Sequence, residues 1–238
     1  SDLDSRMTNY DTSPRDGYSG AFLIVSAAFV AALIVSNILA VKLVQLGPWV
    51  VPAAVIVFPV SYIIGDVLTE VYGYQRARLV IWLGFACNVM AVAAISVAVA
   101  LPAAPFWPHQ EAYAQILGYA PRLLVASFAA YLAGEFANAY VLARLKLLTA
   151  GRWLWLRTIG STLVGQALDS AVFMVVAFTG IIPASALLAA AVTQWLVKSA
   201  YEAAATPLTY WVVGTLKRRE GVDAYDRDID FNPFRLRR

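Results

Sequence analysis

The feature that most constrains this chain is a series of long apolar stretches. Six of them reach the length of about 20 residues that an α-helix needs to cross the roughly 30 Å hydrocarbon core of a bilayer. They cover residues 20–41, 49–71, 78–101, 121–143, 158–180 and 185–215. Only 14% of the residues are charged, compared with about 25% in a typical soluble domain. The sequence therefore predicts an all-α, polytopic membrane protein with six transmembrane helices.

The charges between the stretches predict the orientation in the membrane. Basic residues gather after the second, fourth and sixth stretches, whereas the opposite loops hold only Lys42 and, at the edge of a stretch, Arg122. Because cytoplasmic loops are enriched in Lys and Arg, both termini are predicted to be cytoplasmic. An even number of crossings agrees with this prediction.

Two polar ends flank a single transmembrane domain, which we place at residues 20–219. Residues 1–19 form a polar arm without the apolar core of a signal peptide, and residues 1–6 are interpreted as a tag remnant. Residues 220–238 form a charged tail that we expect to be flexible. The proline- and aromatic-rich segment 102–122 is predicted to lie at the outer interface, as an anchor or as a cover over an opening.

Polar side chains inside the apolar stretches are the best indicators of function, because a charge at the membrane centre costs about 2.5–3.5 kcal/mol on insertion scales. Most of them recur three or four residues apart, so that each group lines one helix face. The set comprises Asn37, Asp66, Glu70, Asn88, Glu135, Asn138, Gln166, Asp169, Gln194, Lys198 and Glu202. Lipid cannot satisfy these groups, so we expect the polar faces to meet inside the bundle.

Several of these residues also have a purely structural interpretation. Glu70 lies near a predicted cytoplasmic end, where it could form an interfacial ion pair. Lys198 could neutralise Asp169 or Glu202. Small residues four apart, such as those that include Gly134 and Gly165, favour close packing of helices over a functional role.

Asn37 and Asn88 could likewise serve as hydrogen-bond partners between helices. For a second group we favour a solute site over packing. Five further groups exceed what helix packing requires, and their acids outnumber the single clear intramembrane base, Lys198. These five are Asp66, Glu135, Asn138, Gln166 and Asp169.

Catalytic residue sets are not evident. The single histidine, His109, lies between stretches, which excludes an intramembrane Ser–His dyad and a metalloprotease His pair. The single cysteine, Cys87, excludes a Cys-rich metal site. A protease that used Asp66 and Asp169 has no supporting motif, and a channel would lack a repeated filter segment. We therefore expect no enzyme activity, no cofactor and no metal, and basic residues in short clusters indicate no nucleic-acid partner.

A carrier of small solutes remains. Carboxylates and amides in an apolar cavity suit a small planar solute with several N–H donors, on which aromatic rings could stack. The aromatic candidates, each of which could equally pack in the core, are Phe58, Tyr62, Tyr131, Phe173 and Tyr201.

The stretches around these residues resemble one family. They are SNILAVKLV (36–44), FPVSYIIGDVLTEVYGYQRAR (58–78), PAAPFWP (102–108), ASFAAYLAGEFANAYVLARLK (126–146), RWLWLRTIGSTLVGQALDSAVF (152–173) and VKSAYEAAATPLTYWVV (197–213). Together, over roughly residues 20–219, they resemble the queuosine precursor transporters, also grouped as a vitamin-uptake-like transporter family of bacteria and archaea.

The resemblance implies six helices in the bacterial or archaeal cytoplasmic (inner) membrane. It also implies uptake of the free bases 7-cyano-7-deazaguanine, 7-aminomethyl-7-deazaguanine or queuine for tRNA modification. The residues predicted to bind substrate are Asn37, Asp66, Glu135, Asn138, Gln166, Asp169 and Lys198. Glu70 and Glu202 are predicted to serve coupling or gating. One carboxylate, from Glu135 or Asp169, is expected to accept the N1–H and 2-amino donors of the base.

Other functions remain open at this point. A carrier for another vitamin or nucleobase, resembling the substrate-binding subunit of an energy-coupled importer, would need partner ATPases. A structural membrane protein would pair off all its intramembrane charges and leave no cavity. The partners we expect are a small-molecule substrate and membrane lipid, and a homodimer is compatible with a chain of this size. The preferred base and the choice between proton-coupled and facilitated transport stay open.

Overall fold

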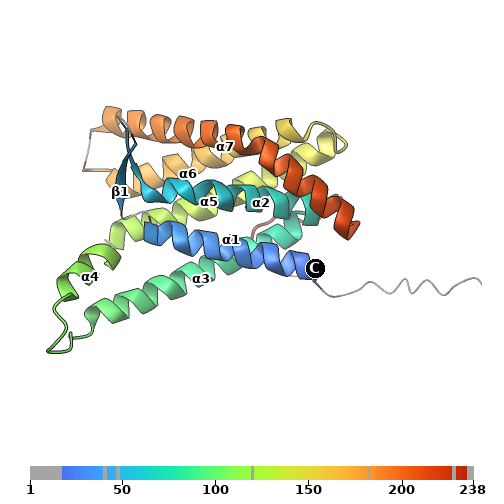
Figure 1. Ribbon diagram of the computed structural model, residues 1–238. Coiled ribbons are helices and arrows are strands. Elements are labelled where there is room, and N and C mark those ends of the chain that lie inside the picture. The colour runs from blue at the N-terminus through green and yellow to red at the C-terminus, as the bar shows by residue number, and fades with distance from the viewer. Residues whose placement is uncertain are drawn as a thin grey trace, which may run out of the picture.

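The computed structural model describes residues 18–39, 42–46, 49–118, 121–181, 183–226 and 229–234. In this part of the chain, long α-helices run side by side in an elongated bundle (Figure 1). The helices are α1 (Gly20–Leu39), α2 (Phe58–Tyr72), α3 (Tyr74–Ala100), α4 (Gln110–Leu117), α5 (Pro121–Leu148), α6 (Leu154–Phe178) and α7 (Ala184–Glu220). The predicted helical class is thereby confirmed.

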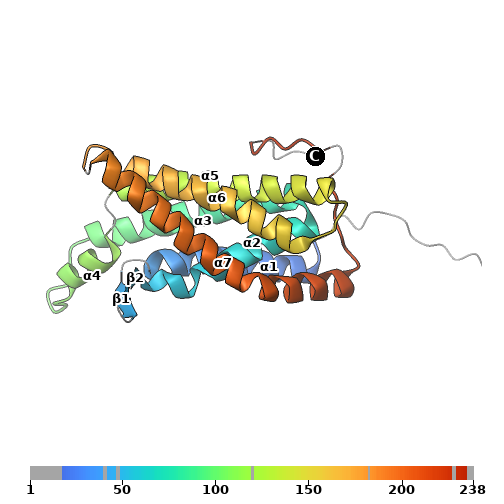
Figure 2. The ribbon, with the colours of Figure 1, turned by 90° about the horizontal axis from the view of Figure 1, so that it is seen from above.

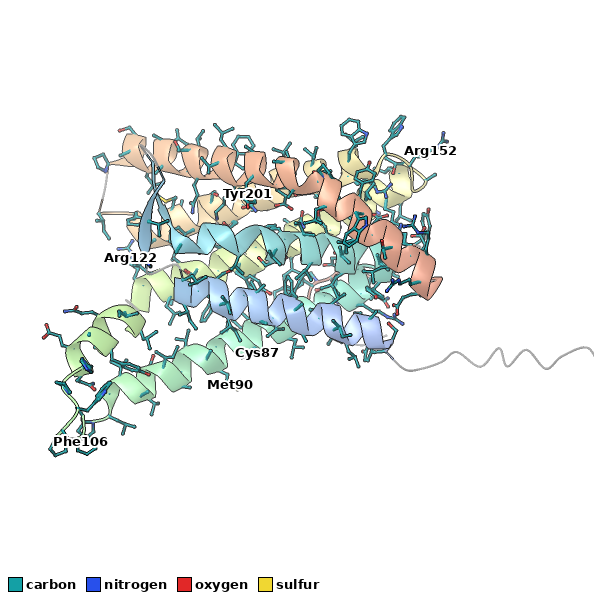
Figure 3. All side chains as sticks on the ribbon, viewed as in Figure 1. Cys87, Met90, Phe106, Arg122, Arg152 and Tyr201 are labelled. Carbon is teal, nitrogen blue, oxygen red and sulfur yellow. The ribbon has the colours of Figure 1, made fainter. Side chains whose placement is uncertain are left out.

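The two ends of the bundle differ in what they carry. Helix α1 begins and α7 ends at one end, which also holds the α2–α3 and α5–α6 turns (Figures 1 and 2). Basic residues of these turns and helix ends include Arg78, Lys146, Arg157 and Lys217, and we call this the basic end. The other end carries α4 and a hairpin, and we call it the hairpin end. Figure 3 shows Arg152 at the basic end and Phe106 at the far tip of the opposite loop.

By length and composition, four described helical segments can cross a membrane, namely Gly20–Leu39, Tyr74–Ala100, Gln110–Leu148 and Leu154–Phe178. Helix α7 has 37 residues but carries charges and Pro207. Helix α2 has 15 residues, or roughly 22 Å, which is shorter than the roughly 30 Å hydrocarbon core. Apolar side chains such as Met90, which is 66% exposed, cover the outside of the bundle. The chain is therefore a multi-pass membrane protein.

The predicted helix over 49–71 is wrong in its first part. Strand β1 (Leu43–Leu46) pairs antiparallel with β2 (Trp49–Pro52), and the 3-10 helix η1 (Ala53–Ile56) follows. Helix α2 begins only at Phe58, with a proline in its first turn, where proline is well tolerated. The β-branched and aromatic residues of this stretch favour strands, a preference that hydropathy alone does not reveal.

Helices α5 and α6 make the most extensive contact in the bundle. A Cβ atom on Gly165 would lie 2.8 Å from Asn138 Cβ and 2.9 Å from the carbonyl oxygen of Gly134. A Cβ on Gly134 would lie 2.8 Å from Asp169 Cβ. The close packing expected at these glycines is confirmed, and it brings the polar faces of the two helices together.

The described part of the tail that we expected to be flexible makes contacts with the helices. Residues 222–226 and 229–234, here called the C-terminal segment, lie against α3 and α5. Asp226 accepts hydrogen bonds from the backbone N–H of Tyr74 at 3.0 and 2.9 Å, and Trp82 donates to the Pro233 carbonyl at 2.8 Å. Phe231 packs on Tyr74. The reason is local: the Asp226 carboxylate accepts from the free N–H of Tyr74 at the start of α3, and aromatic side chains of the segment pack on aromatic partners.

The segment 102–122, which we predicted to lie at the outer interface, contains helix α4. Its residues are not buried, and Phe106, 88% exposed, lies far from the bundle axis (Figure 3). This position fits an interfacial anchor better than a cover over an opening.

Candidate solute-binding site

A cavity of about 380 Å³ lies inside the bundle. Its lining comes from the last turns of α1, from η1, from the first turn of α2, and from α3, α5, α6 and α7. These positions place the cavity in the half of the bundle nearer the hairpin end. Small-molecule sites typically measure about 300–1,000 Å³, so this cavity suits a small ligand.

Three charged side chains line the cavity from three different helices: Glu135 on α5, Asp169 on α6 and Lys198 on α7. Lys198 Nζ lies 2.5 Å from Asp169 Oδ2, and both side chains are partly exposed. Glu135 is 3% exposed, and among the described residues no ion pair or hydrogen bond holds its carboxyl group. The Asp169–Lys198 pair therefore neutralises itself, and the Glu135 carboxyl remains available as an acceptor.

Uncharged polar groups and aromatic rings complete the lining. Asn37 Nδ2 donates to Asn88 Oδ1 at 2.7 Å, which joins α1 to α3 at the cavity wall. The residues Ser36 and Gln194 also line the cavity, and their Oγ and Oε1 atoms are buried without a hydrogen-bond partner in the described part of the chain. The aromatic lining residues are Tyr62, Phe128, Tyr131 and Phe173. Buried polar atoms normally find a partner, so these two unpartnered atoms are unusual features of the cavity wall.

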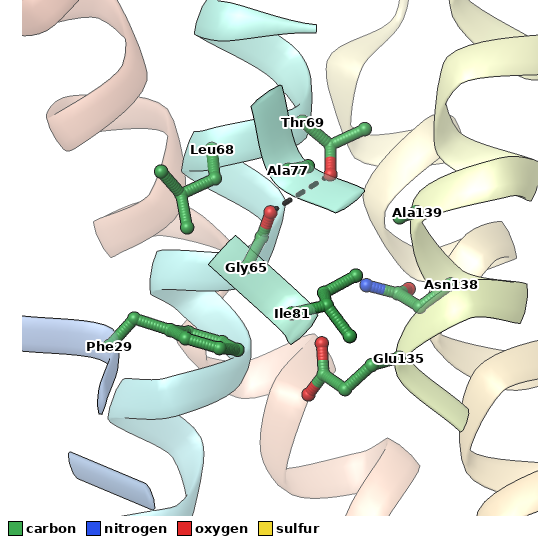
Figure 4. Close-up of a pocket in the computed structure, with 9 residues that line it drawn as sticks. All are labelled: Phe29, Gly65, Leu68, Thr69, Ala77, Ile81, Glu135, Asn138 and Ala139. Atoms are coloured by element: carbon green, nitrogen blue, oxygen red, sulfur yellow. Dashed lines mark hydrogen bonds between the residues drawn. The ribbon is translucent and has the colours of Figure 1, made fainter. Parts of the chain in front are cut away.

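Glu135 forms the inner boundary of the cavity. Behind it lies a narrow gap that Phe29, Gly65 and Ile81 help to line and that has no room for a water molecule (Figure 4). In the same view Thr69 donates to the Gly65 carbonyl at 3.0 Å. The cavity consequently ends at Glu135, and the interior beyond it is closed.

The predicted substrate residues fall into two groups. Four of them line the cavity: Asn37, Glu135, Asp169 and Lys198. The other three, Asp66, Asn138 and Gln166, are buried deeper in the bundle, together with Glu202. Among the residues that the structure describes, no three His, Cys, Asp or Glu side chains are placed to hold a metal ion.

Glu70 lies outside the cavity, fully buried near the basic end. Its Oε1 is 2.6 Å from Arg157 Nη2 and 2.7 Å from Lys217 Nζ. Lys146 donates to the Glu70 carbonyl oxygen at 2.5 Å and to Asp223 at 2.5 Å. Glu70 thus forms ion pairs near the basic end, as its structural interpretation predicts. The C-terminal segment joins this network through Asp223.

The electrostatics of Asp223 reflect this network. Partial burial raises the pKa of Asp223, but hydrogen bonds from Lys146 and Lys217 outweigh burial and hold the pKa below its ordinary value of 3.8. For Asp226, by contrast, burial dominates and raises the pKa of the carboxyl. The basic end therefore stabilises a carboxylate that belongs to the C-terminal segment.

Sequence reasoning missed some of the lining residues, notably Ser36, Ser127 and Phe128. A signal was present for one of them. Ser127, Tyr131 and Glu135 lie four residues apart on α5, so they share one helix face. Extending the polar face of Glu135 by two turns would have identified this side of the cavity.

The fold and the cavity define a class: a multi-pass helical membrane protein with a polar, small-molecule-sized site inside the bundle. A family model described as "Putative vitamin uptake transporter" matches residues 52–212. The chain therefore belongs to this vitamin uptake transporter family, as the resemblance of its motifs implied.

Two curated relatives extend the comparison. The "Probable queuosine precursor transporter" of Bacillus subtilis (strain 168) is 30% identical over 195 residues, which cover 82% of this chain and 83% of the relative. The "Queuosine precursor transporter" of Escherichia coli (strain K12) is 31% identical over 121 residues, 51% of this chain and 52% of the relative. No solved structure matches the chain.

Proposed function

We propose that this protein imports queuosine precursors, the 7-deazaguanine bases, through the cavity and across the bacterial or archaeal inner membrane. The observation that carries the proposal is the convergence of Glu135, Asp169 and Lys198 on one small cavity. The names of the two relatives support the choice of substrate.

The recognition chemistry follows from the open acceptor. A deazaguanine presents N1–H and a 2-amino group on one edge, and a single carboxylate can accept from both. Asp169 is already paired with Lys198, so we assign this edge to Glu135. Lys198 and Gln194 reach the same cavity and would contact the carbonyl oxygen and ring nitrogens of the base. The rings of Tyr62, Tyr131 and Phe173 supply surfaces for stacking.

The charge asymmetry predicts the orientation of the carrier in the membrane. The positive-inside rule assigns the basic end, and with it both termini, to the cytoplasm. The cavity then belongs to the outer half of the protein, where it receives solute from outside. Release inward requires the basic end to open, as alternating access demands, and we assign the Glu70 ion-pair network a role in holding that end shut.

The alternative of a structural membrane protein is disfavoured by specific observations. Such a protein would pair off its intramembrane charges and contain no cavity, whereas Glu135 has no ion-pair partner among the described residues and lines a cavity of about 380 Å³. The family description favours a carrier for another vitamin as the second candidate, and the same cavity would serve it.

The test is uptake in a bacterium that cannot synthesise queuosine and lacks its own carrier. The protein is expressed, each deazaguanine is supplied separately at low concentration, and queuosine is measured in tRNA. We expect rescue by at least one base. With the protein confirmed in the membrane, failure of every base would overturn the assignment and favour the vitamin carrier.

A matched pair of variants tests the site itself. Loss of a hydrogen-bonded charge costs about 1.5–3 kcal/mol, or roughly 10–150-fold, so Glu135→Gln should reduce uptake by that factor at equal expression. Glu111→Gln, a similar change on the exposed α4, should leave uptake unchanged. Full activity in Glu135→Gln would remove Glu135 from the binding site.

A further inference from the structure

A second set of polar side chains lies directly beneath the cavity. Asp66, Asn138, Gln166 and Glu202 come from α2, α5, α6 and α7, and all four are buried. Each is three or four residues from a cavity-lining residue of the same helix and one turn nearer the basic end. We call these four residues the inner polar layer. It separates the cavity from the Glu70 network.

The acids of this layer have polar partners but no cation. Asp66 Oδ1 accepts a hydrogen bond from Asn138 Nδ2 at 2.8 Å, and Glu202 Oε1 accepts one from Thr162 at 2.9 Å. The two carboxylate charges repel each other. In the described part of the chain, no Lys or Arg forms an ion pair with either of them.

The surroundings of the layer add negative rather than positive charge. Facing groups are Tyr62 and Glu70 on α2, Glu135 on α5, and Asp169 on α6, whose charge Lys198 of α7 balances. The cations Arg157 and Lys217 are already bound to Glu70. Two carboxylate charges in a dry interior without a counter-ion are strongly unfavourable. A proton bound to Asp66 or to Glu202 removes this repulsion.

The amides of the layer point to the same missing group. Asn138 Oδ1 is a buried acceptor without a hydrogen-bond partner among the described residues, and neither Oε1 nor Nε2 of Gln166 has a partner of normal geometry there. Buried acceptors nearly always receive a donor, and each unmet one costs about 1–3 kcal/mol. A protonated carboxyl group supplies an O–H donor at this place, where carboxylates supply only acceptors.

We propose that Asp66 and Glu202 form a proton-binding site that couples solute entry to proton entry. This inference rests on the proposed import function. The proton arrives through the cavity and binds to one carboxylate oxygen of the pair. It leaves from the same oxygen toward the cytoplasm when the basic end opens. The cations around Glu70, one turn further along α2, favour this release because a positive charge near the pair disfavours its bound proton.

The experiment uses purified full-length protein in liposomes and labelled 7-cyano-7-deazaguanine, which lacks the aminomethyl amine. Net accumulation is measured with the outside one pH unit more acidic than the lumen, and exchange is measured separately at equal pH. One proton per solute permits accumulation of up to about tenfold for this gradient. A lumenal pH dye should report acidification when the base is added to wild-type liposomes.

The variants Asp66→Asn and Glu202→Gln should lose gradient-driven accumulation yet keep exchange, which shows that they fold and bind. The control Glu111→Gln should keep both. Exchange without accumulation or acidification in the wild type would overturn the proton site, as would full accumulation in both variants. Absence of wild-type exchange would instead overturn the import function.

Discussion

The hairpin half and the basic half of the bundle treat buried polar groups in opposite ways. Around the cavity, Ser36 and Gln194 have buried polar atoms that no described residue satisfies, and the Glu135 carboxyl has no ion pair or hydrogen bond among the described residues. At the basic end, the buried carboxylate of Glu70 contacts Arg157 and Lys217. The C-terminal segment adds further contacts there, but nothing comparable covers the cavity in the described part of the chain.

This difference separates residues that serve binding from residues that serve stability. A buried polar atom without a partner costs free energy, so its persistence indicates a site that a ligand completes. A fully paired buried network stabilises one closed arrangement and becomes costly when one member is removed. Substitutions at the hairpin half should therefore impair uptake, and substitutions at the basic half should impair stability.

The largest expected effect is at Glu70. Glu70→Gln leaves Arg157, which is 1% exposed, buried without its counter-ion, and breaking such a pair costs about 3–5 kcal/mol. We expect a clearly lower unfolding temperature in detergent, whereas Glu111→Gln should unfold like the wild type. Wild-type stability in Glu70→Gln would show that this network does not hold the basic end.

The second-largest expected effect is at the close α5–α6 contact, which lies between the hairpin half and the basic half. Gly165→Ala places a Cβ 2.9 Å from the Gly134 carbonyl oxygen, and such overpacking typically costs about 1–3 kcal/mol. Gly160→Ala is the matched control, since its Cβ meets only the flexible end of Leu145 at 3.2 Å. The control should be neutral or slightly stabilising, because alanine favours helix. Equal unfolding of the two variants would contradict the close crossing.

A variant at the cavity should lose uptake but keep its stability. Gln194→Leu removes an acceptor that has no hydrogen-bond partner among the described residues, so stability should stay within about 0.5 kcal/mol of wild type. Uptake should fall roughly 2–12-fold, the equivalent of one neutral hydrogen bond of about 0.5–1.5 kcal/mol. Thr193→Val, on the exposed neighbouring position, should change neither. If Gln194→Leu were destabilised but fully active, Gln194 would serve stability and not binding.

The smallest effect is a pH dependence at the basic end. The pKa of Asp223 is lower in the folded protein than its ordinary value of 3.8. Its stabilising contribution is therefore fully present above about pH 4 and is lost as the pH falls through the folded pKa. Asp223→Asn should be slightly less stable than wild type at pH 7, and the gap should close in acid. A gap that widens in acid would contradict the lowered pKa.

Hydropathy was sufficient for the helices that are apolar along their whole length. The stretches 20–41 and 78–101 correspond closely to α1 and α3, because a bilayer accepts a long apolar stretch only as a helix. Residues 49–57 were equally apolar but form the hairpin and η1. Pairing of β1 with β2 depends on contacts between residues and is invisible to a hydropathy average.

The charged residues inside the helices could also be identified from the sequence. Which of them are paired with a cation could not. The bilayer makes every intramembrane charge conspicuous, so Glu70, Glu135 and Asp169 stand out from sequence alone. Which of them meets a cation depends on which helices are neighbours. Lys198 reaches Asp169, whereas Arg157 and Lys217 reach Glu70.

The sequence by itself determined the membrane class, the long helices and the polar faces that must point inward, because burial in lipid penalises every exception. Only the tertiary structure decided that Glu135 remains open beside a cavity while Glu70 is closed into a network that the C-terminal segment joins. The physical reason is that cavities and ion pairs arise between helices, from distances of a few ångströms that no single helix encodes.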